Sequence, residues 1–241
     1  NGITLTAQDL SNNTVTGFTG TSVTYSGTAG ITGTSGSFTS GQLSGVSLTP
    51  TVAGSGMTFI VTGSTKSGTS TFDVNPGALD HFVISTITSP QVAGTAITGI
   101  TLTAQDAFNN TATGFTGTVT YSGTAGITGT SAAFSAGVLS GVSVTPTVAG
   151  TGMTFIVTGL TKTGTSTFTV NPGALDHLAM TETSGSALTD KTAGSAFNVK
   201  IVAQDLNNNK VTGYVSTVSI TAAGSTLTGS PVTSGKFASG I

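Results

Sequence analysis

The chain has 241 residues, of which 6% are charged, and its formal net charge is −2. Roughly 25% is usual for a soluble domain, and the weak negative charge argues against a basic surface for nucleic acid or anionic membranes. The absence of cysteine excludes disulfides, thiolate metal sites and a cysteine nucleophile. No apolar run approaches the roughly 18–20 residues that cross a bilayer, so we expect no membrane span in this segment.

The first part of the chain is repeated almost unchanged. Asp9 corresponds to Asp106 and Pro76 to Pro172, at offsets of 97 and 96 positions, and a more divergent third copy follows. A period of this length is that of a domain and not of a short solenoid repeat. The predicted domains are residues 1–76, 77–172 and 173–241. The first is expected to lack its first strand, and the third its last two strands.

Strands are predicted wherever apolar and polar residues alternate. In the second copy the run HFVIST opens the period at His81–Thr86, and Ile100, Leu102 and Ala104 then share one face. The later rows are Val119 with Tyr121, Val142 with Val144, Met153 with Phe155 and Val157, and Phe168 with Val170. This pattern predicts about seven short strands, each with one buried and one solvated face.

These rows predict an all-β fold class: tandem immunoglobulin-like antiparallel β-sandwiches with a period of about 97 residues. Threonine and valine favour strands, while the helix formers glutamate, lysine and arginine are scarce. The Cys…Trp…Cys signature of antibody domains is missing, since the chain contains neither cysteine nor tryptophan.

One turn motif occurs in every copy, as AQDLSNNTVTGF (Ala7–Phe18), AQDAFNNTATGF (Ala104–Phe115) and AQDLNNNKVTGY (Ala203–Tyr214). In such a sandwich this turn returns to the pole where its domain starts. Two interpretations stay open. Carboxylate and amide oxygens at each junction could bind Ca²⁺ weakly, or Asp and Asn could serve only the turn itself. The candidate calcium ligands are Asp80, Asp106, Asn109, Asn110, Asp176 and Asp205.

The remaining polar motifs do not indicate a catalytic site. The two histidines stand in the pairs Asp80–His81 and Asp176–His177, and adjacent strand residues point to opposite faces, so we expect linker packing and no catalytic triad. The chain is therefore predicted not to be an enzyme and to need no cofactor, unless the junctions bind Ca²⁺. Asn12 and Asn109 lie in N-x-[ST] sequons and are candidate glycan acceptors.

Longer runs recur in the same order with the period: NPGALDHFVIS, AGTAITGITLTAQDAFNNTATGFTGTVTYSG and FSAGVLSGVSVTPTVAGTGMTFIVTG. The whole chain thereby resembles the tandem immunoglobulin-like repeats of large bacterial surface and adhesin proteins, such as the invasin/intimin type. Those families commonly have Gly-Asn where this chain has Asn109-Asn110. The resemblance implies a stalk, a spacer or an adhesive array on a cell surface, and such modules are rarely enzymes.

The outward rows are Thr, Ser and Gly, with almost none of the charges that normally protect β-edges. We therefore expect a structural repeat region of an extracellular surface protein, either a stalk or the body of a filament or surface layer. Its partners would be copies of itself or adjacent repeats of the same chain. The alternative is an adhesin module that binds Ca²⁺ or carbohydrate at the loops between domains.

Overall fold

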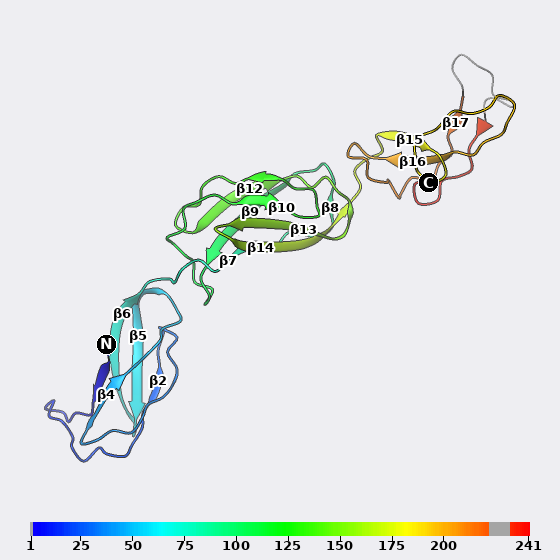
Figure 1. Ribbon diagram of the computed structural model, residues 1–241. Helices are drawn as coiled ribbons and strands as arrows, with labels where there is room; N and C mark the ends of the chain where they lie inside the picture. Colours follow the sequence, from blue (N-terminus) through cyan, green and yellow to red (C-terminus); the bar gives the residue numbers. More distant parts are fainter. Residues whose placement is uncertain (1, 222–231) are drawn as a thin grey trace. The chain divides into compact units, whose positions relative to one another are not determined.

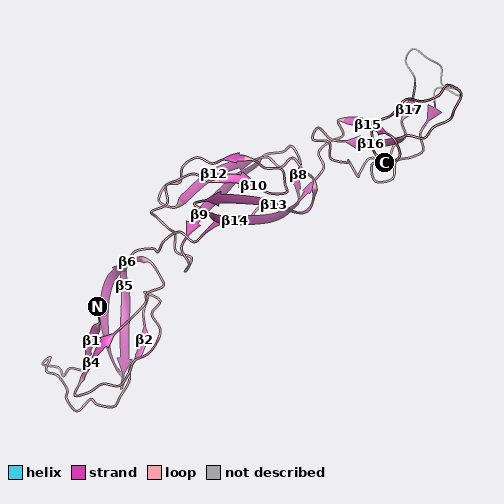
Figure 2. Ribbon diagram, viewed as in Figure 1, coloured by secondary structure: helices cyan, strands magenta, loops and turns pink. Residues whose placement is uncertain are grey.

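The computed structural model describes residues 2–221 and 232–241. These residues form strands and loops but no helix (Figure 2), so the predicted all-β class is confirmed. No membrane-spanning helix is therefore found in the part of the chain that the structure describes. Asn1 of the first predicted copy and residues 222–231 of the third lie outside the described residues.

The strands form in the order of the chain, and Figure 1 labels most of them. The first six are β1 (Ile3–Thr6), β2 (Thr24–Ser26), β3 (Gly33–Thr34), β4 (Gln42–Val46), β5 (Gly54–Gly63) and β6 (Lys66–Val74). The next eight are β7 (His81–Ile84), β8 (Gln91–Val92), β9 (Ile97–Gln105), β10 (Thr120–Ser122), β11 (Gly129–Thr130), β12 (Val138–Val144), β13 (Gly150–Gly159) and β14 (Lys162–Asn171). The last four are β15 (His177–Thr181), β16 (Lys200–Gln204), β17 (Ser219–Ile220) and β18 (Val232–Thr233).

Contacts within the chain divide it into two units. Unit 1 comprises Asn1–His81, Ala104–Thr116 and Ser135–Gly137. Unit 2 comprises Phe82–Thr103, Gly117–Phe134 and Val138–Ile241. Unit 1 thus combines the first sequence copy with the turn motif of the second copy.

Unit 1 contains a two-stranded sheet, β1-β4, and a four-stranded sheet in the order β3-β2-β5-β6. All of these pairs are antiparallel. The core is centred on Ala29, Ile31 and Phe59, and the Phe59 ring meets the Tyr25 ring edge-on at 5.2 Å between centroids. Further side chains pack partly buried against this cluster: Leu5, Leu48, Met57, Val61, Phe72 and Val74.

Unit 2 contains most of a three-stranded sheet in the order β12-β9-β7 and a five-stranded sheet in the order β11-β10-β13-β14-β8. Most pairs are antiparallel, but β8 runs parallel to the end of β14. The two-residue strands β8 and β11 were not expected from alternation, which is not visible over so short a stretch. The smaller sheets β15-β16 and β17-β18 follow.

The predicted apolar rows of the second copy do face a core. Leu102, Phe155 and Val157 are fully buried, and Val119 and Val170 are nearly so. The polar residues between them are half-buried or exposed. A strand with one apolar and one polar face belongs to a sheet that covers a core on one side, and this arrangement is consistent with a β-sandwich.

Candidate functional site: the Asp–Asn turns

The recurring turn begins where β9 ends, at Asp106. One carboxylate oxygen of Asp106, Oδ1, accepts hydrogen bonds from the backbone N–H groups of Phe108 and Asn110, both at 2.9 Å. Between them Asn109 adopts a left-handed conformation with φ of 66°, which asparagine tolerates better than most residues. Asn12 and Asn208 hold the same conformation in the other two copies, with φ of 64° and 65°. Aspartate and asparagine thus have the local role that the turn interpretation predicted.

The Asn110 side chain also makes contacts outside its own turn. Its Nδ2 group donates to the backbone carbonyl of Thr51 at 3.0 Å, and its Oδ1 accepts from the backbone N–H of Ala53 at 2.9 Å. One primary amide offers both a donor and an acceptor, so Asn110 pairs with this backbone segment much as a strand residue would. The turn of the second sequence copy is thereby bonded to the first.

The same contacts recur one period later, within unit 2. Asn209 Nδ2 donates to the carbonyl of Thr147 at 2.9 Å, and Asn209 Oδ1 accepts from the N–H of Ala149 at 2.8 Å. We call each set of two side chains with their backbone partners the Asp–Asn clasp. The first clasp is Asp106 and Asn110 with Thr51, Ala53 and Gly77, and the second is Asp205 and Asn209 with Thr147, Ala149 and Gly173.

The aspartate of each clasp is buried, with 2% exposure at Asp106 and 1% at Asp205. Asp106 Oδ2 accepts from the N–H of Gly77 at 2.8 Å and from Asn110 Nδ2 at 3.0 Å. Burial by itself raises the pKa of this carboxyl, but the donors from Asn110, Gly77 and Phe108 outweigh it and lower the pKa of Asp106 to about 2. The pKa of Asp205 is lowered by the equivalent balance. Both carboxyls are therefore buried as stabilised anions.

In the described part of the first copy the turn forms without these additional partners. Asp9 accepts from the N–H groups of Ser11 and Asn13 at 2.9 Å and from Asn13 Nδ2 at 3.1 Å. Both Asp9 and Asn13 are exposed. The hydrogen bond from Asn13, followed by further backbone donors, lowers the pKa of Asp9 as well. The turn is thus the same in all three copies, and the clasp adds a bonded neighbour to it.

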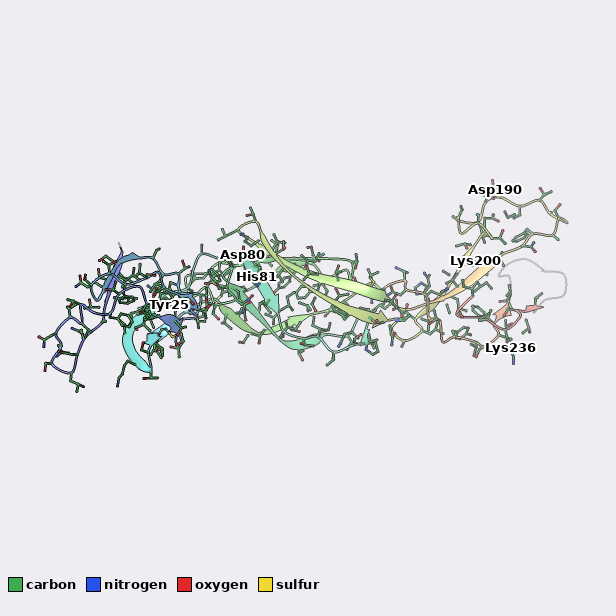
Figure 3. The ribbon with its side chains drawn as sticks, turned by 90° about the horizontal axis from the view of Figure 1, so that it is seen from below. Tyr25, Asp80, His81, Asp190, Lys200 and Lys236 are labelled. Atoms are coloured by element: carbon green, nitrogen blue, oxygen red, sulfur yellow. The ribbon has the colours of Figure 1, made fainter. Side chains whose placement is uncertain are left out.

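The candidate calcium ligands do not gather into one cluster. Asp80 Oδ2 lies 3.2 Å from His81 Nδ1, and Asp176 Oδ2 lies 2.9 Å from His177 Nδ1. Figure 3 labels Asp80 and His81. Asn109 is exposed. Among the described residues, no group of three or more His, Cys, Asp or Glu side chains could hold a metal ion. Calcium binding at these turns stays the untested alternative, for experiment to decide.

The sequon asparagines Asn12 and Asn109 lie at the exposed tips of their turns, where a glycan would have room. Glycosylation also remains a prediction. The linker contacts are polar: His81 Nε2 lies 3.1 Å from Gln105 Oε1, and the N–H of Asp80 donates to the carbonyl of Gln105 at 2.8 Å. These contacts position the linker beside the turn, at the pole that the sequence pattern indicated.

The backbone partners of the clasp were not identified from the sequence. Thr51–Gly54 reappears without change as Thr147–Gly150, and Gly77 reappears as Gly173. Backbone N–H and carbonyl groups carry no side-chain signature, so only this unusually complete repetition pointed to them. A Cβ at Gly77 would lie 3.3 Å from Asp106 Oδ2, which is a reason for glycine at this position.

The chain matches no protein-family model and no curated protein. Among solved structures it is similar to surface layer protein SbsC, domains 4–9, with 21% identity over 95% of this chain and 36% of that chain and a TM-score of 0.32. For SbsC domains 1–6 the identity is 22% over 88% and 27% of the two chains, with a TM-score of 0.31.

A β-glycosidase from Bacteroides vulgatus is similar at 14% identity over 62% of this chain and 21% of that chain, with a TM-score of 0.33. The present chain spans between 21% and 36% of these matched chains. The similar structures come from proteins as different as a surface layer protein and a glycosidase.

Proposed function

We propose that the chain is a non-enzymatic structural region of an extracellular surface protein, built of tandem immunoglobulin-like β-sandwiches. In this role it forms a stalk, or the body of a filament or surface layer. One observation carries the proposal: the same side-chain-to-backbone clasp bonds consecutive sequence copies twice, at Asn110 and at Asn209. A spacer needs such a joint, because its reach depends on the orientation of each copy relative to the next.

The chemistry of the clasp suits a permanent joint. Each hydrogen bond contributes about 0.5–1.5 kcal/mol to stability, and removing one partner so that a buried group is left without a hydrogen bond costs more. The buried Asp106 carboxylate is held by N–H donors from two segments of the second copy, since Gly77 precedes β7 and Asn110 follows β9, and the Asn110 side chain in turn bonds to Thr51 and Ala53 of the first copy. Opening the joint would break both hydrogen bonds of the Asn110 side chain to the first copy.

The surface composition supports association with neighbouring copies. Between Gly94 and Gly159 the sequence has one charged side chain, Asp106, and this side chain is buried. The surface of that stretch therefore carries no charged side chain. Charges on sheet edges normally prevent edge-to-edge pairing, and a net charge near zero removes repulsion between molecules.

The proposal can be tested by electron microscopy of intact cells that produce the protein, labelled with antibody raised against this chain. We expect the label on the outer surface, following regular fibres, projecting stalks or a lattice. Label confined to the cell interior would contradict an extracellular structural role. Label at isolated surface patches that bind to a host or a glycan would favour the adhesin alternative.

A further inference from the structure

The strand β14 of the second copy has an open edge over most of its length. On one side it pairs with β13, and the register is continuous over residues 162–168. On the other side, within residues 2–221 and 232–241, it pairs only with β8, and only at Val170 and Asn171. The second copy includes both β7 and β8, so this edge is open although every predicted strand of the copy is present.

Hydrogen bonds near the end of β14 show which of its residues face the open side. Successive residues of an antiparallel strand direct their backbone groups to opposite neighbours. The Thr169 N–H donates to Ser89 Oγ at 3.0 Å, and the Asn171 carbonyl accepts from the Ala93 N–H at 2.9 Å. Both residues of β14 therefore face away from β13. Three earlier residues are in phase with them and turn their backbone groups to the open side: Thr163, Thr165 and Thr167.

This part of β14 lacks the usual protection of a sheet edge. Natural edges are protected by charge, proline, bulges or short length. Between Thr163 and Asn171 the sequence has neither a charged residue nor a proline, and the pairing with β13 is regular up to Phe168. The other edges of the second copy differ: β12 has two register irregularities, and β7, β8 and β11 have four residues or fewer. Of these edges, β14 is therefore best able to add a further strand.

The open edge is complementary to itself. The side chains of Thr163, Thr165 and Thr167 are exposed, and this row reads the same in both directions about Thr165. When two such strands lie antiparallel with Thr165 opposite Thr165, Thr163 of each strand lies opposite Thr167 of the other. Each of these pairs can exchange two backbone hydrogen bonds, and Thr–Thr pairs across strands are favourable. A two-fold contact uses the same patch on both molecules in this way.

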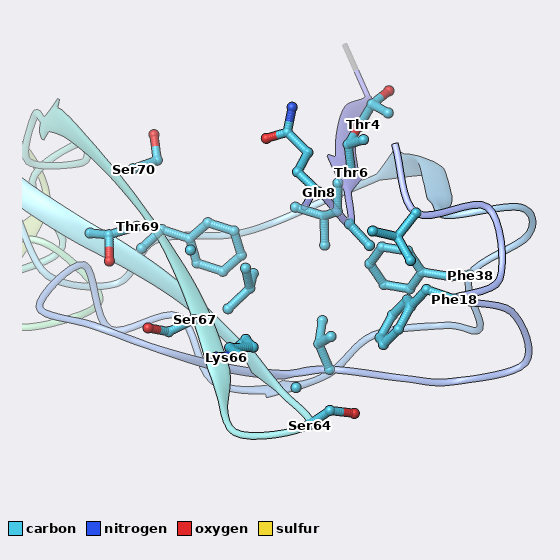
Figure 4. Close-up of a pocket in the computed structure, with 18 residues that line it drawn as sticks. Thr4, Thr6, Gln8, Phe18, Phe38, Ser64, Lys66, Ser67, Thr69 and Ser70 are labelled. Atoms are coloured by element: carbon cyan, nitrogen blue, oxygen red, sulfur yellow. The ribbon is translucent and has the colours of Figure 1, made fainter. Parts of the chain in front are cut away.

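The first copy has a similar row in β6, with one difference. Ser67 and Thr69 correspond to Thr163 and Thr165, and Figure 4 shows both on β6. Farther along the strand β6 has Asp73, where β14 has an uncharged threonine. Because a charge on an edge strand opposes pairing, the inference below applies to β14.

We propose that β14 of one molecule pairs antiparallel with β14 of a second copy of this chain, about a two-fold axis at Thr165. The two five-stranded sheets thereby become one continuous sheet across the pair. This inference rests on the proposed function, because it deepens the association between copies. It assigns that association to one strand edge and to one register.

Cysteine crosslinking of the complete chain tests this register directly, because the chain has no cysteine of its own. Cα atoms of a hydrogen-bonded pair are about 5.5 Å apart, which a disulfide can span. Under mild oxidation Thr165→Cys should therefore form disulfide-linked dimers. Ser122→Cys is the matched control, since Ser122 is exposed and lies in the same cross-strand row, Ser122–Ile156–Thr165, two strands from the edge. It should form no such dimer.

Charge variants at the same two positions measure the association at equilibrium. Thr165→Lys places like charges opposite each other and should lower the association constant about tenfold in analytical ultracentrifugation. Ser122→Lys should associate as the parent does, and both variants should keep the parent's melting temperature because both side chains are exposed.

Three results would overturn the pairing: a monomeric parent, equal crosslinking of the two cysteine variants, or undiminished association of Thr165→Lys. The last two would leave the proposed surface role standing, since molecules would still associate through another face. Failure of that role is seen separately, as antibody label confined to the cell interior.

Discussion

At the scale of single residues, Asp106 illustrates how a sequence of low charge uses one of its few carboxylates. Burial of an anion is costly unless hydrogen bonds replace its hydration. Here the backbone of the turn, the Asn110 side chain and the N–H of Gly77 all donate to it. The carboxylate consequently organises the turn and ties it to the segment that precedes β7.

Acid should weaken this arrangement. The pKa of Asp106 is about 2 in the folded chain and about 3.9 for an unfolded aspartate. A group whose pKa is lowered by folding contributes stability above the unfolded value, and that contribution is lost as the pH falls through the folded value. We therefore expect the melting temperature to fall between about pH 4 and pH 2.

The control for this acid effect is Asp106→Asn, which cannot titrate. It should be less stable than the parent at pH 6, and the difference between the two proteins should shrink as the pH falls to about 2. A difference that stays constant from pH 6 to pH 2 would show that ionised Asp106 does not contribute to folding.

We expect calcium not to stabilise the junctions between sequence copies. Both oxygens of Asp106 already accept hydrogen bonds from N–H donors, and a cation would have to displace them. Adding about 1–5 mM Ca²⁺, near the affinity of extracellular calcium modules, should leave the melting temperature unchanged. A rise of several degrees that Asp106→Ala abolishes would identify a calcium site instead.

The turn itself could be predicted from the sequence, because Asp and Asn at these spacings have a local tendency to form it. Its nearness to the linker followed from strand order. The role of Asn110 could not be predicted, since its partners are backbone atoms of Thr51 and Ala53, 59 and 57 positions earlier. A sequence pattern gives no information about which distant loop a side chain meets.

At the scale of strands, the inward and outward rows of β13 differ in what they contribute. Phe155 is fully buried and its ring meets that of Tyr121 at 5.2 Å, so Phe155→Ala should cost about 3–5 kcal/mol of unfolding free energy. Denaturant or thermal unfolding measures this loss. Effects of Phe155→Ala below ~1 kcal/mol would contradict the assignment of the buried face.

Thr154, on the other face of β13, contributes more than its outward position suggested. Its Oγ1 accepts from the N–H of Thr124 at 2.9 Å and lies 3.1 Å from Thr124 Oγ1. Because these bonds are exposed to solvent, Thr154→Ala should cost about 1 kcal/mol, the usual net value of a hydrogen bond. Val at this position keeps the shape but not the hydroxyl, so Thr154→Val should lose a similar amount.

The turn between β13 and β14 is strained. Leu160 and Thr161 have φ of 48° and 67°, although left-handed conformations are unfavourable for such side chains by roughly 1–2 kcal/mol each. A two-residue hairpin turn of this shape prefers Asn-Gly. The double substitution Leu160→Asn, Thr161→Gly should therefore raise the unfolding free energy by about 1 kcal/mol or more. An unchanged or lower stability would contradict the strain that these φ values indicate.

Strand positions in the second copy were largely predictable, because alternation over five or more residues is a strong signal, as in β13 and β14. The sequence did not reveal β8 or β11, which have two residues each and are specified by their neighbours. Val119 is buried, as its row with Tyr121 predicted, although it lies one residue before β10 and outside the strand itself. Burial there depends on packing between sheets and not on strand pairing.

At the scale of the whole molecule, the proposed structural role depends on the bonds between consecutive sequence copies. The first two copies are nearly identical in sequence and the third has diverged, yet both clasps use the same atoms. The bond that the asparagine Nδ2 donates is 3.0 Å long in the first clasp and 2.9 Å in the second, and the bond that its Oδ1 accepts is 2.9 Å and 2.8 Å long. The joint is thus retained although the surrounding residues differ. The division into three domains remains a prediction from the period.

Hydrogen exchange of the Ala53 N–H, followed by NMR, tests this central claim most directly. That group donates to Asn110 Oδ1, so Asn110→Ala should speed its exchange by about tenfold, the equivalent of ~1.4 kcal/mol. Asn13→Ala is the matched control, because Asn13 bonds only to its own turn in the described structure; it should leave Ala53 unaffected. Equal exchange at Ala53 in the parent and in Asn110→Ala would contradict the clasp and, with it, the proposed joint between copies.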